Sequence, residues 1–219
     1  MNRIKAIIFD FDGVVVKSNH IKTKAFRELY KNQKKNIINK IINYHKINAG
    51  TSRTKKILFF QKDILKKDFS KSSIAKKNMI FSNLVFEKVS NSKFLPGVKN
   101  FLKKNYTSKL LFISSGTPQK ELRKICNNKN ISFYFKGIYG SPLNKTAHIK
   151  KIMKKWNLKK NNILFIGDSL TDFNASKECE LHFLGIGNYL KKNIDKSHFN
   201  QKDLTNLQRV IDKIEKNSI

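Results

Sequence analysis

Residues Ile4 to Gly13 read IKAIIFDFDG, and this stretch decides the predicted fold. Its apolar run Ala6–Phe9 is short and unbroken, which is typical of a strand buried on both faces of a parallel sheet. Asp10 and Asp12 follow the run directly. In parallel α/β sheets, chemistry takes place in the crevice beyond the carboxyl ends of the strands. We therefore expect both aspartates to emerge in that crevice.

Asp10 and Asp12 are separated by one residue, and carboxylates this close repel each other unless a cation or a proton intervenes. A hard divalent ion with oxygen ligands, most simply Mg²⁺, meets that need. Taken alone, the stretch fits a strand that runs into an Asp-Gly turn equally well. Two later stretches favour the metal site.

The second stretch, Lys109 to Pro118, reads KLLFISSGTP. Leu110–Ile113 is another apolar run of the kind found in buried strands. It is followed by Ser114, Ser115 and Gly116. Hydroxyl groups and free backbone N–H groups at a strand end, just before a helix, suit an anion.

The third stretch, Asn162 to Asp172, reads NILFIGDSLTD. Its apolar run Ile163–Ile166 predicts a third strand, which Asp168 follows closely, with Asp172 four residues further on. Of the 15 acidic residues in the chain, four therefore follow predicted strands. Three strands that end in such polar groups indicate one site for a metal ion and a phosphate.

This combination resembles the haloacid dehalogenase-like superfamily, most of whose members are Mg²⁺-dependent phosphatases. The four motifs of that superfamily are matched in order by Asp10–Gly13, by Ser114 or Ser115, by Lys145 after a Ser-Pro, and by Gly167–Asp172. The resemblance extends from Ile4 to about Ile186. It implies an α/β fold with a Rossmann-like parallel sheet as core and an inserted helical cap subdomain.

The segment 17–93 is where the superfamily places its C1 cap. Apolar residues recur there at helical spacing, as in Ile21, Ala25 and Leu29, and nothing reads as a strong strand. We therefore predict a core of residues 1–16 and 94–219 and a helical C1 cap of residues 17–93.

The resemblance also implies roles for the acidic residues. Asp10 is the expected nucleophile, which forms an aspartyl-phosphate. Asp12 is the expected general acid and base, and its backbone carbonyl is an expected metal ligand. Asp168 completes the predicted metal site, and Asp172 is either a ligand or a group that orients one.

The phosphoryl group has its own expected partners. Either Ser115 or Ser114 binds its oxygens, and we favour Ser115 because Ser-Gly-Thr-Pro reads as one turn. Lys145 is expected to neutralise charge on the phosphoryl group and on the nucleophile. Gly13 and Gly116 are the glycines expected beside the substrate.

The cap is expected to select the substrate. Ser52 and Arg53 resemble a cap loop of phosphoglycolate phosphatase-like and phosphoglucomutase-like members, in which the arginine reaches the substrate. An exposed arginine at a helix start is the alternative. The mutase members carry a His where this chain has Lys22, which favours simple hydrolysis. The dehalogenase branch lacks a second aspartate, so Asp12 argues against that activity.

Composition limits the partners. The 219 residues carry a formal charge of +31, and 39% of them are hydrophobic. The charge comes mostly from lysines spread along the chain, so coding bias in an AT-rich genome explains it better than a nucleic-acid partner, which stays open. No apolar run approaches the ~20 residues of a membrane span.

The two cysteines, Cys126 and Cys179, fit a reduced compartment, and we predict a cytoplasmic protein that does not bind membranes, either a monomer or a homodimer. The predicted function is Mg²⁺-dependent hydrolysis of a small phosphorylated metabolite through an aspartyl-phosphate. One alternative is a β-phosphoglucomutase-like phosphotransferase. Another, from a different class, is a basic nucleic-acid-binding protein or polynucleotide end phosphatase on the same scaffold.

Overall fold

The computed structural model describes residues 3–188, 190 and 199–216, and six parallel strands form its central sheet in the order β3-β2-β1-β4-β5-β6. Each of the five strand pairs is parallel. The strands are β1 (Ala6–Phe9), β2 (Leu110–Pro118), β3 (Gly137–Ser141), β4 (Ile163–Gly167), β5 (His182–Ile186) and β6 (Phe199–Gln201).

Strand β1 lies inside the sheet, between β2 and β4, and all four of its residues are buried. Its side chains alternate between two apolar cores, with Ile7 and Phe9 on one face and Ala6 and Ile8 on the other. A strand that is covered on both faces has no position for a polar side chain. This explains the unbroken run AIIF and confirms the prediction of a buried central strand.

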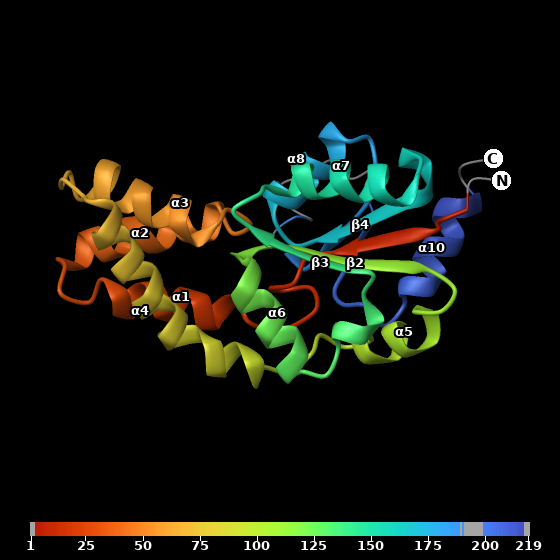
Figure 1. The fold of residues 1–219 in the computed structure, drawn as a ribbon, viewed down its shortest axis with the longest axis horizontal. Helices are drawn as coiled ribbons and strands as arrows, with labels where there is room; N and C mark the ends of the chain where they lie inside the picture. The colour runs from red at the N-terminus through yellow and green to blue at the C-terminus, as the bar shows by residue number, and fades with distance from the viewer. Residues whose placement is uncertain (1–2, 189, 191–198, 217–219) are drawn as a thin grey trace.

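Helices cover both faces of this sheet (Figure 1). Helices α7 (Lys145–Trp156) and α8 (Leu170–Glu178) contribute Ile149 and Ala175 to the core that contains Ile8. The opposite core receives side chains from α5 (Val98–Asn105), α6 (Gln119–Asn128) and α10 (Leu207–Lys216). The predicted α/β fold with a Rossmann-like parallel core is confirmed.

The first four of the five α-helices between β1 and β2 form the cap, which extends beyond one end of the sheet (Figure 1). Its centre is aromatic, with the Phe26 ring 5.4 Å from that of Phe60 and 4.4 Å from that of Phe81. The cap elements are α1 (Asn19–Leu29), α2 (Lys35–Ile47), α3 (Arg53–Phe59), a π-helical turn η1 (Phe60–Ile64) and α4 (Lys71–Ser90).

The two connections between cap and core run side by side, because Val16 and Phe94 form an isolated antiparallel bridge. This bridge lies next to the predicted boundaries at 16/17 and 93/94, which stay a prediction. Among the helices of the described residues, none has both the length and the apolar character that crossing a membrane requires.

Strand β2 is longer than the apolar run Leu110–Ile113 predicted. It continues through the polar residues to Pro118, because Ser114 pairs with Tyr139 and Pro118 with Ser141 of β3, with a shift of register between them. The residues expected just beyond the strand therefore form its last, irregular part, and α6 begins only at Gln119.

Candidate active site

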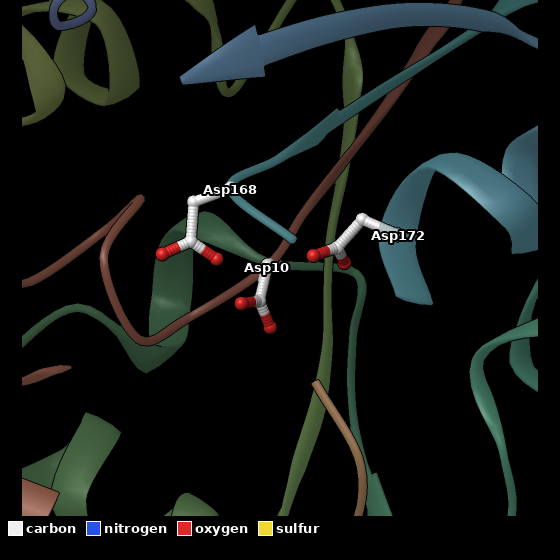
Figure 2. Close-up of side chains that lie close together, drawn as sticks. All are labelled: Asp10, Asp168 and Asp172. Carbon is white, nitrogen blue, oxygen red and sulfur yellow. The ribbon is translucent and has the colours of Figure 1, made fainter. Parts of the chain in front are cut away.

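Three carboxylates converge at the carboxyl ends of β1 and β4 (Figure 2). Asp10, Asp168 and Asp172 each present one oxygen atom, and these atoms lie within 4.8 Å of one another. The backbone N–H of Asp10 donates to the Ile166 carbonyl at 2.8 Å, which fixes the end of β1 against β4. Asp10 and Asp172 are buried, and Asp168 is half-buried.

Lys145 is the cation of this cluster. Its Nζ lies 3.0 Å from Asp10 Oδ1 and also contacts Asp172 Oδ1, and its side chain is only 4% exposed. Lys145 is the first residue of α7, whose preceding residue Asn144 caps the helix by accepting from Ala147 N at 2.8 Å. The hydrogen bond from Ala147 N to Asn144 fixes where α7 begins and so directs the ammonium group of Lys145 onto the carboxylates.

Asp172 is held by the start of α8. Its Oδ2 accepts from the backbone N–H of Ser169 at 3.2 Å and from the Ser169 hydroxyl at 2.5 Å. The first of these bonds is one half of the capping box that Ser169 and Asp172 form. Both carboxylate oxygens of Asp172 therefore have donors in the protein. This arrangement suits a group that orients the site as well as a direct ligand, and both roles stay open.

The electrostatics of the cluster call for a further cation. Burial raises the pKa of Asp10 well above its usual range, although the charge of Lys145 lowers it. The neighbouring Asp172 and Asp168 also raise it. Burial and Asp172 raise the pKa of Asp168 to about 7. Lys145 is itself buried, yet Asp10 and Asp172 keep its pKa above the usual value. One lysine thus compensates three acids only in part, and their oxygen donors fit a hard divalent cation.

Asp12 is not part of the three-carboxylate cluster and has partners of its own. Its Oδ1 accepts from Ser18 Oγ at 2.6 Å, and its Oδ2 accepts from Lys22 Nζ and from Thr117 Oγ1 at 3.2 Å. Burial opposes ionisation of Asp12, but Lys22 and the two hydroxyl donors outweigh it and lower the pKa. Asp10 and Asp12, although separated by one residue, thus have pKa values that are shifted in opposite directions.

The two serines of β2 face different surroundings. Ser114 is fully buried, and its Oγ lies 2.8 Å from His148 Nδ1, while His148 Nε2 lies 3.2 Å from the Gly140 carbonyl. Ser115 instead lines a cavity that Asp10 and Asp168 also line, and its Oγ accepts from the backbone N–H of Thr117 at 3.1 Å. The structure therefore brings Ser115, and not Ser114, to the same cavity as Asp10.

This cavity of about 290 Å³ lies between the core and the cap. The core contributes Asp10, Asp12, Ser115, Gly116, Thr117, Pro118, Glu121 and Asp168, and the cap contributes Asn19, Lys22, Thr23, Phe26, His45, Lys46, Ala49, Gly50, Thr51, Arg53, Lys56 and Phe81. Cavities of this size bind small molecules.

The two predicted glycines allow close approach. Gly13 has φ +85°, and a Cβ atom there would collide with Asp168 Oδ2 and Asn19 Nδ2. Gly116 lines the cavity, and a Cβ atom there would come within 2.8 Å of the Gly50 carbonyl of the cap. Larger residues at either position would therefore disturb the site or the contact of the cap with the core.

Arg53 lines the cavity but is already paired. Its Nη2 lies 2.7 Å from Oε2 of Glu121 on α6, and Ser82 Oγ on α4 donates to the same Glu121 oxygen at 2.5 Å. Arg53 is 6% exposed, so the alternative of an exposed arginine at a helix start is wrong. Ser52 caps α3 by accepting from Lys55 N at 3.5 Å. A substrate contact for Ser52 and Arg53 stays a prediction.

The chain matches the family model of the haloacid dehalogenase-like hydrolases over residues 7–186. This range includes all the site residues described above. The chain belongs to the haloacid dehalogenase-like hydrolase family. The resemblance predicted from the motifs is thus confirmed. Among curated proteins, no sequence matches this hydrolase significantly.

Solved structures share the fold of this hydrolase over nearly its whole length. A β-phosphoglucomutase from Clostridium difficile matches with TM-score 0.77 and 21% identity, covering 98% of this chain and 99% of that one. A predicted phosphoglycolate phosphatase from Haemophilus somnus 129pt gives 0.76 and 19%, covering 96% and 98%. CbbY from Rhodobacter sphaeroides, in complex with phosphate, gives 0.74 and 14%, covering 93% and 96%.

The raised pKa values lead to a prediction about the stability of this hydrolase without metal. A carboxyl group whose pKa is about 7 in the folded protein and near 3.8 in the unfolded chain binds its proton more tightly when folded. The stabilisation that this one carboxyl group provides is therefore fully present below about pH 4 and is lost as the pH rises toward 7. We expect the Tm in EDTA to fall over this range and the fall to shrink with Mg²⁺. A Tm that is independent of Mg²⁺ at pH 7 would contradict this.

Proposed function

We propose that this hydrolase is a Mg²⁺-dependent phosphatase that transfers the phosphoryl group of a small metabolite first to Asp10 and then to water. The observation that carries the proposal is the arrangement around Asp10, whose carboxylate contacts Lys145 and shares a cluster with Asp168 and Asp172. Asp10 and Asp168 also line a small cavity. A carboxylate is a suitable nucleophile there because it needs no base to activate it once ionised.

In the first step an oxygen of Asp10 attacks phosphorus. The phosphorus–oxygen bond to the leaving group breaks, and Asp12 donates a proton to the departing alkoxide. Lys22 and two hydroxyl donors hold Asp12 ionised in the free protein, so the proton that Asp12 donates arrives with the substrate or from solvent. Ser115 and the backbone near Gly116, which line the cavity, bind phosphoryl oxygens.

In the second step a water molecule attacks the phosphorus of the aspartyl-phosphate. Asp12, now a carboxylate, accepts a proton from this water, and the bond between phosphorus and the Asp10 oxygen breaks. The products are inorganic phosphate and regenerated Asp10. Because Asp12 lies on the cavity wall, apart from the three-carboxylate cluster, it reaches the leaving group and the water on the cavity side.

The residues that would hold Mg²⁺ are Asp10, Asp168, the backbone carbonyl of Asp12 and, directly or through an orienting role, Asp172. When bound, the ion supplies positive charge to the phosphoryl oxygens. Lys145 adds a positive charge of its own, 3.0 Å from Asp10 Oδ1. Charge compensation of this kind is the main contribution that proteins make to phosphoryl transfer.

The names of the structural neighbours support a small phosphorylated substrate. They include a predicted phosphoglycolate phosphatase, a β-phosphoglucomutase, and CbbY in complex with xylulose-1,5-bisphosphate. The cavity of about 290 Å³ has room for such a molecule. A cytoplasmic location is part of the proposal, and so is the interpretation of the charge of +31 as a feature of composition.

The test is release of inorganic phosphate from a panel of phosphorylated metabolites, with Mg²⁺ and with EDTA. We expect turnover of at least one small ester with Mg²⁺ and none with EDTA. Interconversion of sugar phosphate isomers without net phosphate release would indicate the phosphotransferase instead. Salt-sensitive retention on DNA, together with turnover of polynucleotide ends alone, would overturn the proposal in favour of the nucleic-acid alternative.

A further inference from the structure

Ser114 of β2 and His148 of α7 form a buried polar pair that the reaction proposed above does not use. Ser114 is fully buried, and His148 is 1% exposed. Ser114 Oγ lies 2.8 Å from His148 Nδ1, and His148 Nε2 lies 3.2 Å from the carbonyl oxygen of Gly140 on β3. An apolar pair of the same shape could replace two such side chains at little cost in stability. The pair therefore calls for an explanation other than the stability of the core.

The chemistry of the ring decides which group donates. Burial lowers the pKa of His148 to about 4, although the hydrogen bond with the Gly140 carbonyl opposes this shift. The charges of Lys145 and Lys151 lower it as well, so the ring is neutral at pH 7. A neutral imidazole has one N–H and one acceptor nitrogen, and a carbonyl oxygen only accepts. The N–H is therefore on Nε2, and the Ser114 hydroxyl donates to Nδ1 of His148.

His148 fixes α7 to the central sheet. Apart from the contacts of Lys145, the side chains of α7 make two further sets of hydrogen bonds within the described part of the chain. Thr146 and Lys150 donate to Glu178 on α8, and both of these bonds are exposed to solvent. The bonds of His148 are the buried ones, and they lead to β2 and β3. The placement of α7 on the sheet thus depends on one ring for its directional contacts.

The partners of this contact are next to groups that the proposed reaction uses. Lys145 precedes His148 by three residues on α7, and residues at this spacing lie on one side of a helix. Ser115, which lines the cavity, directly follows Ser114. In the ladder between β1 and β2, the final pair of residues immediately precedes Asp10 on one side and Ser114 on the other. The buried pair thus connects the surroundings of Asp10 and Ser115 with the start of α7.

We propose that the hydrogen bond from Ser114 to His148 is a positioning contact, which holds Lys145 in its place relative to Asp10 and Ser115. This inference rests on the proposed function, since it assigns Lys145 and Ser115 to the transferred phosphoryl group. A buried and fully satisfied hydrogen bond favours one relative placement of the two elements that it joins. That placement matters because catalysis of phosphoryl transfer consists largely of positioning and of charge compensation.

Two amides at position 148 separate the two hydrogen bonds of the ring. In His148→Asn, the amide oxygen takes the place of Nδ1, so the acceptor for Ser114 is kept and the bond to Gly140 is lost. In His148→Gln, the amide nitrogen takes the place of Nε2, so the bond to Gly140 is kept and the acceptor for Ser114 is lost. Both variants remove the ring, so each is the packing control of the other. Ser114→Ala removes the donor itself.

We expect Ser114→Ala and His148→Gln to lower kcat for the best ester of the panel by about tenfold and to change KM by less than about threefold, because misplaced groups weaken the transition state more than the bound substrate. His148→Asn should stay within about threefold of the wild-type kcat, although its Tm falls as much as that of His148→Gln. The double variant of Ser114→Ala with His148→Gln should be no slower than either single variant, because both changes remove the same bond.

A kcat that follows the Tm across these variants overturns the inference, because the pair would then serve the fold alone. So does an equal loss of kcat in His148→Asn and His148→Gln. Losses that multiply in the double variant would mean that Ser114 acts without His148, which also overturns it. If neither amide variant folds, as judged by circular dichroism, Ser114→Ala decides: the tenfold loss of kcat at unchanged KM supports the inference, and an unchanged kcat overturns it. Absence of phosphate release by the wild type would instead refute the proposed function.

Discussion

Replacing Asp10 by asparagine is expected to lower kcat by at least about 10⁴-fold, because the amide is a poor nucleophile and removal of a covalent nucleophile has effects of this order. Asparagine has nearly the same shape as aspartate, so the cavity and the surrounding contacts should persist. The measurement is phosphate release with Mg²⁺ from the best substrate of the panel, at saturating concentration, for wild type and Asp10→Asn.

The stability of Asp10→Asn separates a chemical effect from a structural one. Burial and the neighbouring carboxylates raise the pKa of Asp10, so its ionised form is held at a cost in the metal-free protein. We expect the Asn variant to unfold at the same temperature as wild type in EDTA, or at a higher one. Asp63→Asn, on an exposed part of the cap, is the matched control and should keep full activity. An Asp10→Asn protein within about tenfold of wild-type activity would refute the mechanism.

Much of the fold could be predicted because its determinants are local in the sequence. The runs Ala6–Phe9 and Ile163–Ile166 are buried strands with bounds close to those expected. Parallel strands end at one edge of a sheet, so residues that follow β1 and β4 had to meet there. This reasoning placed Asp10 and Asp168 correctly without any knowledge of the cap.

The contact partners of the other site residues could not be predicted, because such contacts depend on how elements that are distant in the sequence pack together. Asp12 is held by Lys22 of α1 and Thr117 of β2, and Arg53 is paired with Glu121, 68 residues away. Lysine and arginine make up 46 of the 219 residues, so the identity of a lysine says little about its place. Packing alone distinguishes buried Lys56 from its exposed neighbour Lys55.

The choice between Ser114 and Ser115 shows the same limit. Successive residues of a strand point to opposite faces, so one of the two had to face the cavity. The sequence does not say which one, because β2 continues past both of them to Pro118. Ser114 contacts His148 on α7, and this contact explains why Ser114 is the serine that points away from the cavity.

Replacing Lys145 by methionine is expected to damage both activity and stability. The ammonium group contacts Asp10 and Asp172 and is only 4% exposed, so its removal leaves buried carboxylates without their cation. Breaking a buried ion pair in this way costs about 3 kcal/mol of unfolding free energy. Loss of a positive charge beside the phosphoryl group lowers kcat by about 10²- to 10³-fold. Chemical denaturation in EDTA and steady-state kinetics with Mg²⁺ measure the two effects.

The response to Mg²⁺ then shows whether Lys145 and a divalent ion stabilise the same carboxylates. If they do, Mg²⁺ restores more of the lost stability in Lys145→Met than it adds to wild type, because the ion is the remaining cation among three acids. Lys150→Met removes the same charge from an exposed position on α7 and should behave as wild type in both measurements. Equal stabilisation of wild type and Lys145→Met by Mg²⁺ would mean that the lysine and the ion act independently, and Lys145 would then belong to the fold rather than to the phosphoryl-transfer site.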